Sequence, residues 1–116
     1  MINPSEYQFL SSLEKKVWDW LAKNKIPFET EQTMLAPARE IGSAVVDFLI
    51  PAKNLILRVM GSYWHSGLTA KARDEFAKER LLNQGYIVVD LWEPNLETPE
   101  KLEATMRLAL QGQEVI

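Results

Sequence analysis

The 116-residue chain contains no cysteine, a single histidine and no run of about 18 apolar residues. The absence of cysteine excludes disulfides and thiolate-bound zinc, and a lone histidine excludes a metal site built from several histidines. The absence of a long apolar run predicts that no segment spans a membrane. The N-terminal stretch MINPSEYQFL lacks the cationic start and apolar stretch of a secretory signal. We therefore expect a protein of a reducing compartment, the cytoplasm.

Several common functional motifs are also missing. The sequence contains no phosphate-binding loop, dinucleotide fingerprint, serine-nucleophile elbow or HExxH motif, so nothing indicates a small-molecule enzyme of these classes. The net charge of −3 argues against binding of nucleic acid through the overall charge of the protein. It leaves room for a local basic face, for which the candidates are Lys15, Lys16, Arg39, Lys53, Lys71 and Arg73.

What the sequence does contain fits one α/β domain over residues 1–116, with 47% hydrophobic residues to form its core. Apolar spacing and turn residues predict elements in the order α-β-β-β-α-β-α. The expected ranges are a helix from Asn3 to Pro27, strands at 28–35, 44–50 and 55–60, a helix at 69–83, a strand at 86–92 and a helix from Thr98. The helix before the last strand makes a crossover, which predicts a parallel strand pair in a mixed central sheet flanked by helices.

The helix at 69–83 has a mixed-sign charged surface and a few apolar residues. We expect its inner side to carry Leu68, Ala72, Phe76 and either Leu81 or Leu82. Its charged residues are typical of a solvated helix face with local ion pairs. An alternative is that the cations contact a nucleic-acid backbone, with Lys71, Arg73 and Lys78 as candidates.

Asp47 breaks the pattern of its strand, because it lies inside the apolar run VVDFLI. An ionised carboxylate in such a place needs a cation or several hydrogen-bond donors. It is therefore a candidate metal ligand or catalytic acid. The alternative is a carboxylate at the rim of the sheet, paired with Arg39 or Lys53.

Three further charged residues fall among apolar neighbours. Arg58, inside the next strand, can pair with Asp47 or Glu14 or can face a phosphate. Glu14 lies in or beside the apolar stripe of the first helix, where an acid is usually solvated. Asp90 interrupts the last strand and is the main rival for an acidic role. We expect it to end the strand in solvent or to pair with a neighbour.

The segment Tyr63-Trp64-His65 follows the second long strand. His65 can act as a general base near neutral pH, although a lone histidine is more often an ordinary loop residue. Tyr63 and Trp64 can close the end of the core, or they can stack against bases.

Taken together, these segments resemble the very-short-patch-repair-like branch of the PD-(D/E)XK nuclease superfamily, and small phage and bacterial proteins. The resemblance covers roughly residues 5–95 and lies in Glu14, in VDFLIP at 46–51 and in LILRVMGSYWH at 55–65. It also covers the helix and the strand that follow. It implies a restriction-endonuclease-like core and a place in a bacterial or phage-infected cell. Arg58 and Met60 stand where the usual (D/E)xK acid and lysine would be, which weakens the expectation of ordinary nuclease activity.

The resemblance also implies roles for individual residues. Asp47 and the carbonyl of Val59 would bind the metal, Glu14 would act near the metal waters, and His65 would assist catalysis. Trp64 would insert into the duplex, with Tyr63 beside it. Arg58 would either hold the scissile phosphate or lower the affinity for metal.

Two functions follow from these observations. The first is a metal-dependent DNA endonuclease or nickase that uses Mg²⁺ or Mn²⁺, the hard cations suited to phosphodiester cleavage. The alternative is a non-catalytic nuclease-fold module for nucleic-acid binding or assembly, in which Arg58 neutralises Asp47 or Glu14. DNA is the expected partner in the first case. A homodimer is compatible with the resemblance, although nothing in the sequence requires one.

Overall fold

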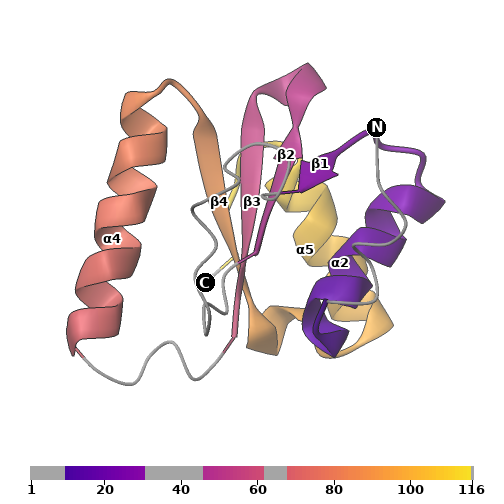
Figure 1. Cartoon of the computed structure of the whole chain (residues 1–116). Coiled ribbons are helices and arrows are strands. Elements are labelled where there is room, and N and C mark those ends of the chain that lie inside the picture. Colours follow the sequence, from indigo (N-terminus) through magenta and orange to yellow (C-terminus); the bar gives the residue numbers. More distant parts are fainter. Residues whose placement is uncertain (1–9, 31–45, 62–67, 116) are drawn as a thin grey trace.

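The computed structural model describes residues 10–30, 46–61 and 68–115, and of residues 46, 47 and 68–74 it describes the backbone alone. The described part is a mixed α/β fold, as predicted (Figure 1). Its helices and strands are α2 (Ser12–Lys23), β1 (Glu29–Thr30), β2 (Val46–Ile50), β3 (Leu55–Met60), α4 (Leu68–Asn83), β4 (Ile87–Trp92) and α5 (Pro99–Ala109). Within these residues, no helix has both the length and the apolar character needed to cross a membrane.

The strands form one four-stranded sheet in the order β1-β2-β3-β4. β2 pairs antiparallel with both β1 and β3. A short 3-10 turn at Pro51–Lys53 joins β2 directly to β3, so these two strands run in opposite directions. β3 and β4 are parallel, since α4 carries the chain back between them. The predicted mixed sheet with a parallel last pair is therefore confirmed.

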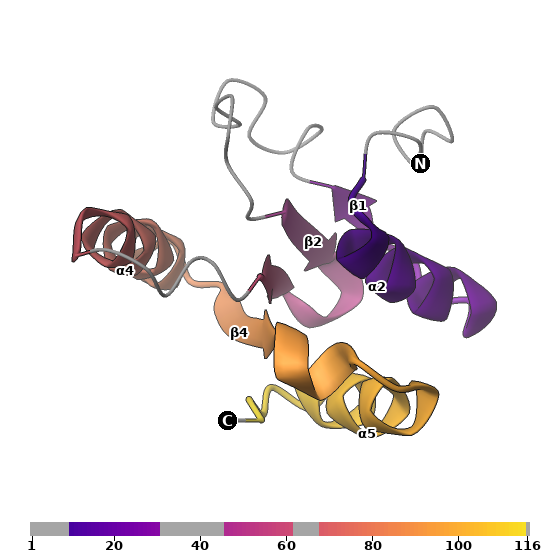
Figure 2. The same cartoon turned by 90° about the horizontal axis from the view of Figure 1, so that it is seen from below.

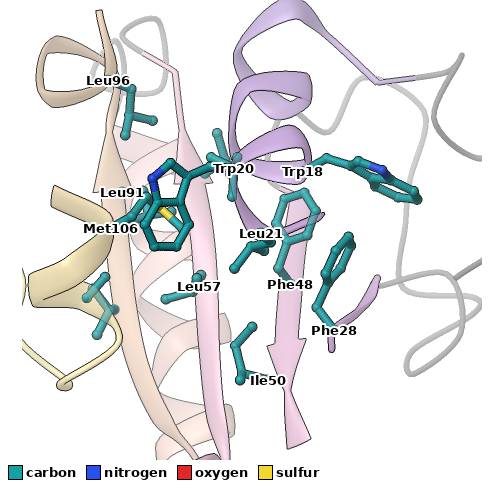
Figure 3. Close-up of a cluster of buried hydrophobic side chains, with 14 of the residues drawn as sticks. Trp18, Trp20, Leu21, Phe28, Phe48, Ile50, Leu57, Leu91, Leu96 and Met106 are labelled. Carbon is teal, nitrogen blue, oxygen red and sulfur yellow. The ribbon is translucent and has the colours of Figure 1, made fainter. Parts of the chain in front are cut away.

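The helices lie on both sides of the sheet, with α2 and α5 on one side and α4 on the other (Figure 2). The first face of the sheet, covered by α2 and α5, holds the apolar core around Leu57 and Leu91 (Figure 3). Helix residues such as Leu21 and Met106 complete this core. The alternate residues of β3 point to the second face, and all three are buried: Ile56, Arg58 and Met60.

The start of α2 differs from the predicted helix start at Asn3, which lies outside the described residues. Ser11 is the N-cap of α2, and its extended backbone (φ −71°, ψ 168°) interrupts any helix running through Leu10. Its side chain and that of Glu14 form a reciprocal capping box. The helix ends at Lys23, before Pro27, because Asn24 caps it and Lys25 takes a positive φ of 57°.

The predicted inner side of α4 is wrong at Phe76, whose side chain is 66% exposed. Leu82 is 48% exposed, whereas Leu81 is 6% exposed and faces the sheet. Residues 76 and 81 lie about 140° apart around a helix, so both cannot face inward. Lys78 lies only about 60° from Leu81 around the helix, and it bonds to Asp90 of β4. This contact accounts for the observed rotation of α4.

Candidate functional site

The candidate site is built on one row of residues that runs across three strands. In the antiparallel pair, Asp47 of β2 lies directly opposite Arg58 of β3. In the parallel pair, Arg58 lies opposite Asp90 of β4. The row therefore brings Asp47, Arg58 and Asp90 to neighbouring backbone positions. The side chain of Asp47 lies outside the described part of the structure.

Arg58 and Asp90 form a bidentate ion pair on the second face of the sheet. Arg58 donates from Nε to Asp90 Oδ1 at 2.7 Å and from Nη2 to Oδ2 at 2.9 Å. Arg58 is 1% exposed and Asp90 3% exposed. A buried guanidinium is tolerated only with such close, charge-assisted hydrogen bonds, because removing both charges from water is costly. Each charge of this pair therefore needs the other in order to be buried in the sheet.

Lys78 and Glu114 extend the pair into a network that joins α4, β4 and the segment after α5. Lys78 Nζ lies 3.3 Å from Asp90 Oδ2 and 3.6 Å from Glu114 Oε1. Glu114 Oε1 also accepts the backbone N–H of Asp90 at 3.1 Å, and its Oε2 accepts Trp92 Nε1 at 3.2 Å. We refer to Arg58, Lys78, Asp90 and Glu114 as the ion-pair network. Its two cations are matched by its two carboxylates.

These contacts change the expectations for Arg58 and Asp90. Asp90 was expected to end its strand in solvent or to pair with a neighbour; it is buried, so the first alternative is wrong and the second is confirmed. The expected partners of Arg58 were Asp47, Glu14 or a phosphate, and the contacts above add Asp90. Asp90 occupies the Nε–Nη2 edge of Arg58, an edge that suits bidentate recognition of a phosphate.

Glu14 lies away from this row. It is buried in the first turn of α2, where its Oε1 accepts the backbone N–H of Ser11 at 2.8 Å. The Ser11 hydroxyl in turn accepts the N–H of Glu14 at 3.2 Å. α2 covers the first face of the sheet, whereas the Arg58 side chain belongs to the second. The capping box explains why an acid is present beside the apolar stripe.

Val59, whose carbonyl is the predicted metal ligand, sits in the middle of the sheet. Its side chain is buried in the first-face core. Its backbone is in register with Val46 on one side and with Leu91 on the other. A carbonyl at such a position lies in the plane of the sheet and points toward a neighbouring strand.

The remaining predicted contacts fall where the structure gives no side-chain positions. Tyr63, Trp64 and His65 lie outside the described residues. Lys71 and Arg73 lie within α4, and for them the backbone alone is described.

Among the residues whose side chains are described, no three Asp, Glu or His side chains come together as a metal-binding group. Of the predicted ligands, Glu14 caps α2 and Val59 lies in the sheet, whereas the side chain of Asp47 lies outside the described part of the structure. Mg²⁺ keeps several waters and is commonly held by one or two carboxylates, so a single strand carboxylate suits it. No protein-family model, curated protein or solved structure matches the chain.

The ion-pair network contains a member that sequence reasoning missed. Glu114 lies in the polar stretch QGQEVI, which carries no periodic pattern that would mark it. The pairing of Arg58 with Asp90 had a usable signal, because each charge interrupts an apolar strand and the two strands were predicted to be parallel. Opposite charges buried in adjacent strands are expected to meet when the register aligns them.

Proposed function

We propose that the chain is a metal-dependent nuclease that cleaves phosphodiester bonds in DNA, with Asp47 as the essential carboxylate. The row across β2, β3 and β4 is the observation that supports this proposal. Arg58 and Lys78 are matched in charge by Asp90 and Glu114. Asp47 lies next to these charges along the row, and a carboxylate there can hold a divalent cation.

The proposal assigns the chemistry to few residues. Asp47 would hold Mg²⁺ or Mn²⁺, which would polarise the phosphate when bound. His65 would take a proton from the attacking water. Tyr63 and Trp64 would contact bases, and the cations at 71 and 73 would contact the DNA backbone. Arg58 is a positioning residue in this proposal, because Asp90 holds its guanidinium.

The test is cleavage of supercoiled plasmid DNA by purified protein in the presence of Mg²⁺ or Mn²⁺. We expect nicking or cutting by the wild type and none by Asp47→Asn. Glu97→Gln is the matched control, since it removes one exposed carboxylate that pairs only at the surface with Lys101; it should cleave like the wild type. Cleavage that survives Asp47→Asn, or no cleavage of duplex, mismatched or single-stranded DNA, would reject the proposal.

A second candidate is a non-catalytic module of the same kind that binds nucleic acid or assembles with a partner. It is favoured by the fixed positive charge of Arg58 at the position directly opposite Asp47, because a nearby cation disfavours a second one. Titration with Mn²⁺, followed by calorimetry, separates the two functions. Binding that is lost in Asp47→Asn supports the nuclease. DNA binding without any metal binding supports the module.

A further inference from the structure

Of the side chains of α4 that the structure describes, those of residues 75–83, few contact the rest of the fold. α4 stands to one side of the sheet, with β4 as its nearest strand (Figure 2). Of its residues 75–83, all are exposed except Lys78 and Leu81. Lys78 bonds to Asp90 and to Glu114, whereas Leu81 packs near the end of the helix. Within residues 75–83, Lys78 and Leu81 are therefore the residues that attach α4 to its neighbours.

The segment Gln113–Val115 is folded back against β4. After α5, Gly112 takes a positive φ of 81°, which suits glycine, and its N–H donates to Ala109 O at 2.9 Å. The N–H of Gln113 donates to Leu108 O at 3.0 Å. Beyond this turn, Val115 O accepts Asn95 Nδ2 at 2.8 Å. Both ends of the segment are thus attached, which places Glu114 beside β4.

Glu114 connects β4 with α4. Among the described strands, β4 lies at the edge of the sheet, and the N–H of Ile87 donates to Asn54 O on the inner side. By the alternation of a strand, the N–H of Val88, Asp90 and Trp92 point away from β3. Glu114 accepts the outward N–H of Asp90 together with the indole N–H of Trp92. The same carboxylate lies 3.6 Å from Lys78 Nζ.

We infer that Gln113–Val115 is a strap that locks α4 against the edge of β4 through Glu114. One carboxylate accepts two hydrogen bonds from β4 and forms an ion pair with Lys78 of α4, so it contacts both elements at once. Without it, Lys78 keeps its 3.3 Å contact to Asp90 but loses its ion pair with Glu114, and the outward N–H of Asp90 loses its acceptor. The strap therefore sets how firmly α4 is held, with little effect on the apolar core of the first face.

The strap would also affect nucleic-acid binding. This consequence rests on the proposed function, whereas the strap itself does not. Lys71 and Arg73 belong to α4, so the strap would fix the orientation of the helix that carries them toward DNA.

The experiment is amide hydrogen exchange on the full chain, comparing wild type with Glu114→Gln. We expect the amides of residues 75–83 and of Asp90 to exchange faster, on the order of threefold to tenfold. Exchange in β3, which reports opening of the core, should keep its wild-type rate. A glutamine at 114 cannot accept two N–H groups with two oxygens, and it carries no charge to attract Lys78.

Two further variants sharpen the result. Glu97→Gln removes an exposed carboxylate and should leave all of these rates unchanged. Lys78→Met releases the helix alone, so α4 should exchange faster while the Asp90 amide stays protected by Glu114. If α4 exchanges at the wild-type rate in Glu114→Gln, there is no strap, even if Lys78→Met accelerates its exchange. Equal acceleration of every amide, including those of β3, would also overturn the inference, because it would mean a general loss of stability.

Discussion

Arg58 is more deeply buried than either of the acids Asp90 and Glu14 in the described structure. A fixed positive charge in a β-sheet is costly unless its donors are met by a carboxylate in good geometry. Asp90 provides that geometry, with two hydrogen bonds of 2.7 and 2.9 Å. Each member of this pair therefore depends on the other, and removing one leaves a buried charge behind.

The stability of the protein should respond strongly to the loss of either charge in this pair. Asp90→Ala should lower the free energy of unfolding by about 3 kcal/mol, because the Arg58 charge stays buried. The double variant Arg58→Met/Asp90→Ala should cost clearly less than the sum of the two single changes. Urea denaturation measures all three. Additive single costs would show that the two residues act independently.

Glu14 is expected to serve the N-terminus of α2, and its substitution can separate that role from catalysis. Glu14→Gln should change stability by less than about 0.5 kcal/mol, because glutamine also closes a capping box. Ser11→Ala should cost about 1 kcal/mol, since it removes the N-cap acceptor. Thermal unfolding measures both. If Glu14→Gln keeps its stability yet alters DNA cleavage, the role near the metal that the resemblance implies would regain support.

At the scale of elements, α4 shows how an ion pair can decide the rotation of a helix. Its exposed face carries Phe76, and its inward side carries Lys78 and Leu81. The helix has few apolar residues, so no broad stripe competes with the contact of Lys78 to Asp90.

Two substitutions in α4 test this rotation directly. Leu81→Ala should cost about 2 kcal/mol or more, because it removes buried side-chain volume. Phe76→Ala should change stability by less than about 0.5 kcal/mol, since the ring is exposed. Chemical denaturation of both variants gives the comparison. A larger cost at Phe76 than at Leu81 would mean that the helix turns its other side to the sheet.

The contact between α2 and α5 should influence stability at acid pH. Trp20 Nε1 donates to Glu103 Oε1 at 2.7 Å, and this hydrogen bond is the main reason that the pKa of Glu103 lies below its ordinary value of 4.5. A hydrogen bond and an ion pair with Arg107 lower the pKa further. Because the folded state holds this carboxyl ionised, its contribution is present above pH 4.5 and is lost as the pH falls through the lowered pKa.

Trp20→Phe removes the main donor and should raise the pKa of Glu103 toward 4.5. A carbon-13 NMR titration of the side-chain carboxyls measures the change. Arg107→Gln should also raise the pKa of Glu103, because it removes an ion pair and weakens a hydrogen bond that lower it. An unchanged pKa of Glu103 in Trp20→Phe would contradict the role given to this hydrogen bond.

For the molecule as a whole, the sheet separates two kinds of packing. The first face is apolar and is covered by α2 and α5, which join distant parts of the chain (Figure 3). Lys16, for example, donates to the carbonyl of Leu96, 80 residues away. The second face holds the ion-pair network and is approached by α4. The candidate chemistry belongs to the second face, while the first supplies a rigid support for the strands that position it.

Much of the fold could be predicted because local signals were strong. β3 and β4 are short apolar runs rich in branched residues, bounded by turn residues, so their ranges were confirmed to within about two residues. The parallel pairing followed from the helix between them. The start of α2 was predicted wrongly, because one helix was expected from Asn3 to Pro27, whereas the S-x-x-E capping signal of Ser11 and Glu14 begins the helix at Ser12.

The side-chain partners at the candidate site were harder to predict from the sequence. Whether Arg58 meets Asp47, Glu14 or Asp90 depends on register and on the face that each element presents, and a shift of one residue reverses the face. Glu114 was missed for a related reason. Its position depends on a turn at Gly112 that brings a distant polar segment back to β4.

By itself, the sequence determined the kinds of element, their order along the described chain and the presence of charges inside apolar strands. Those properties depend on neighbouring residues, through periodicity, turn chemistry and the solvation of charge. The tertiary structure decided which charges meet, which side of α4 faces the sheet and where Glu114 binds. Those depend on the register of strands and the rotation of helices, which bring together side chains far apart in the chain.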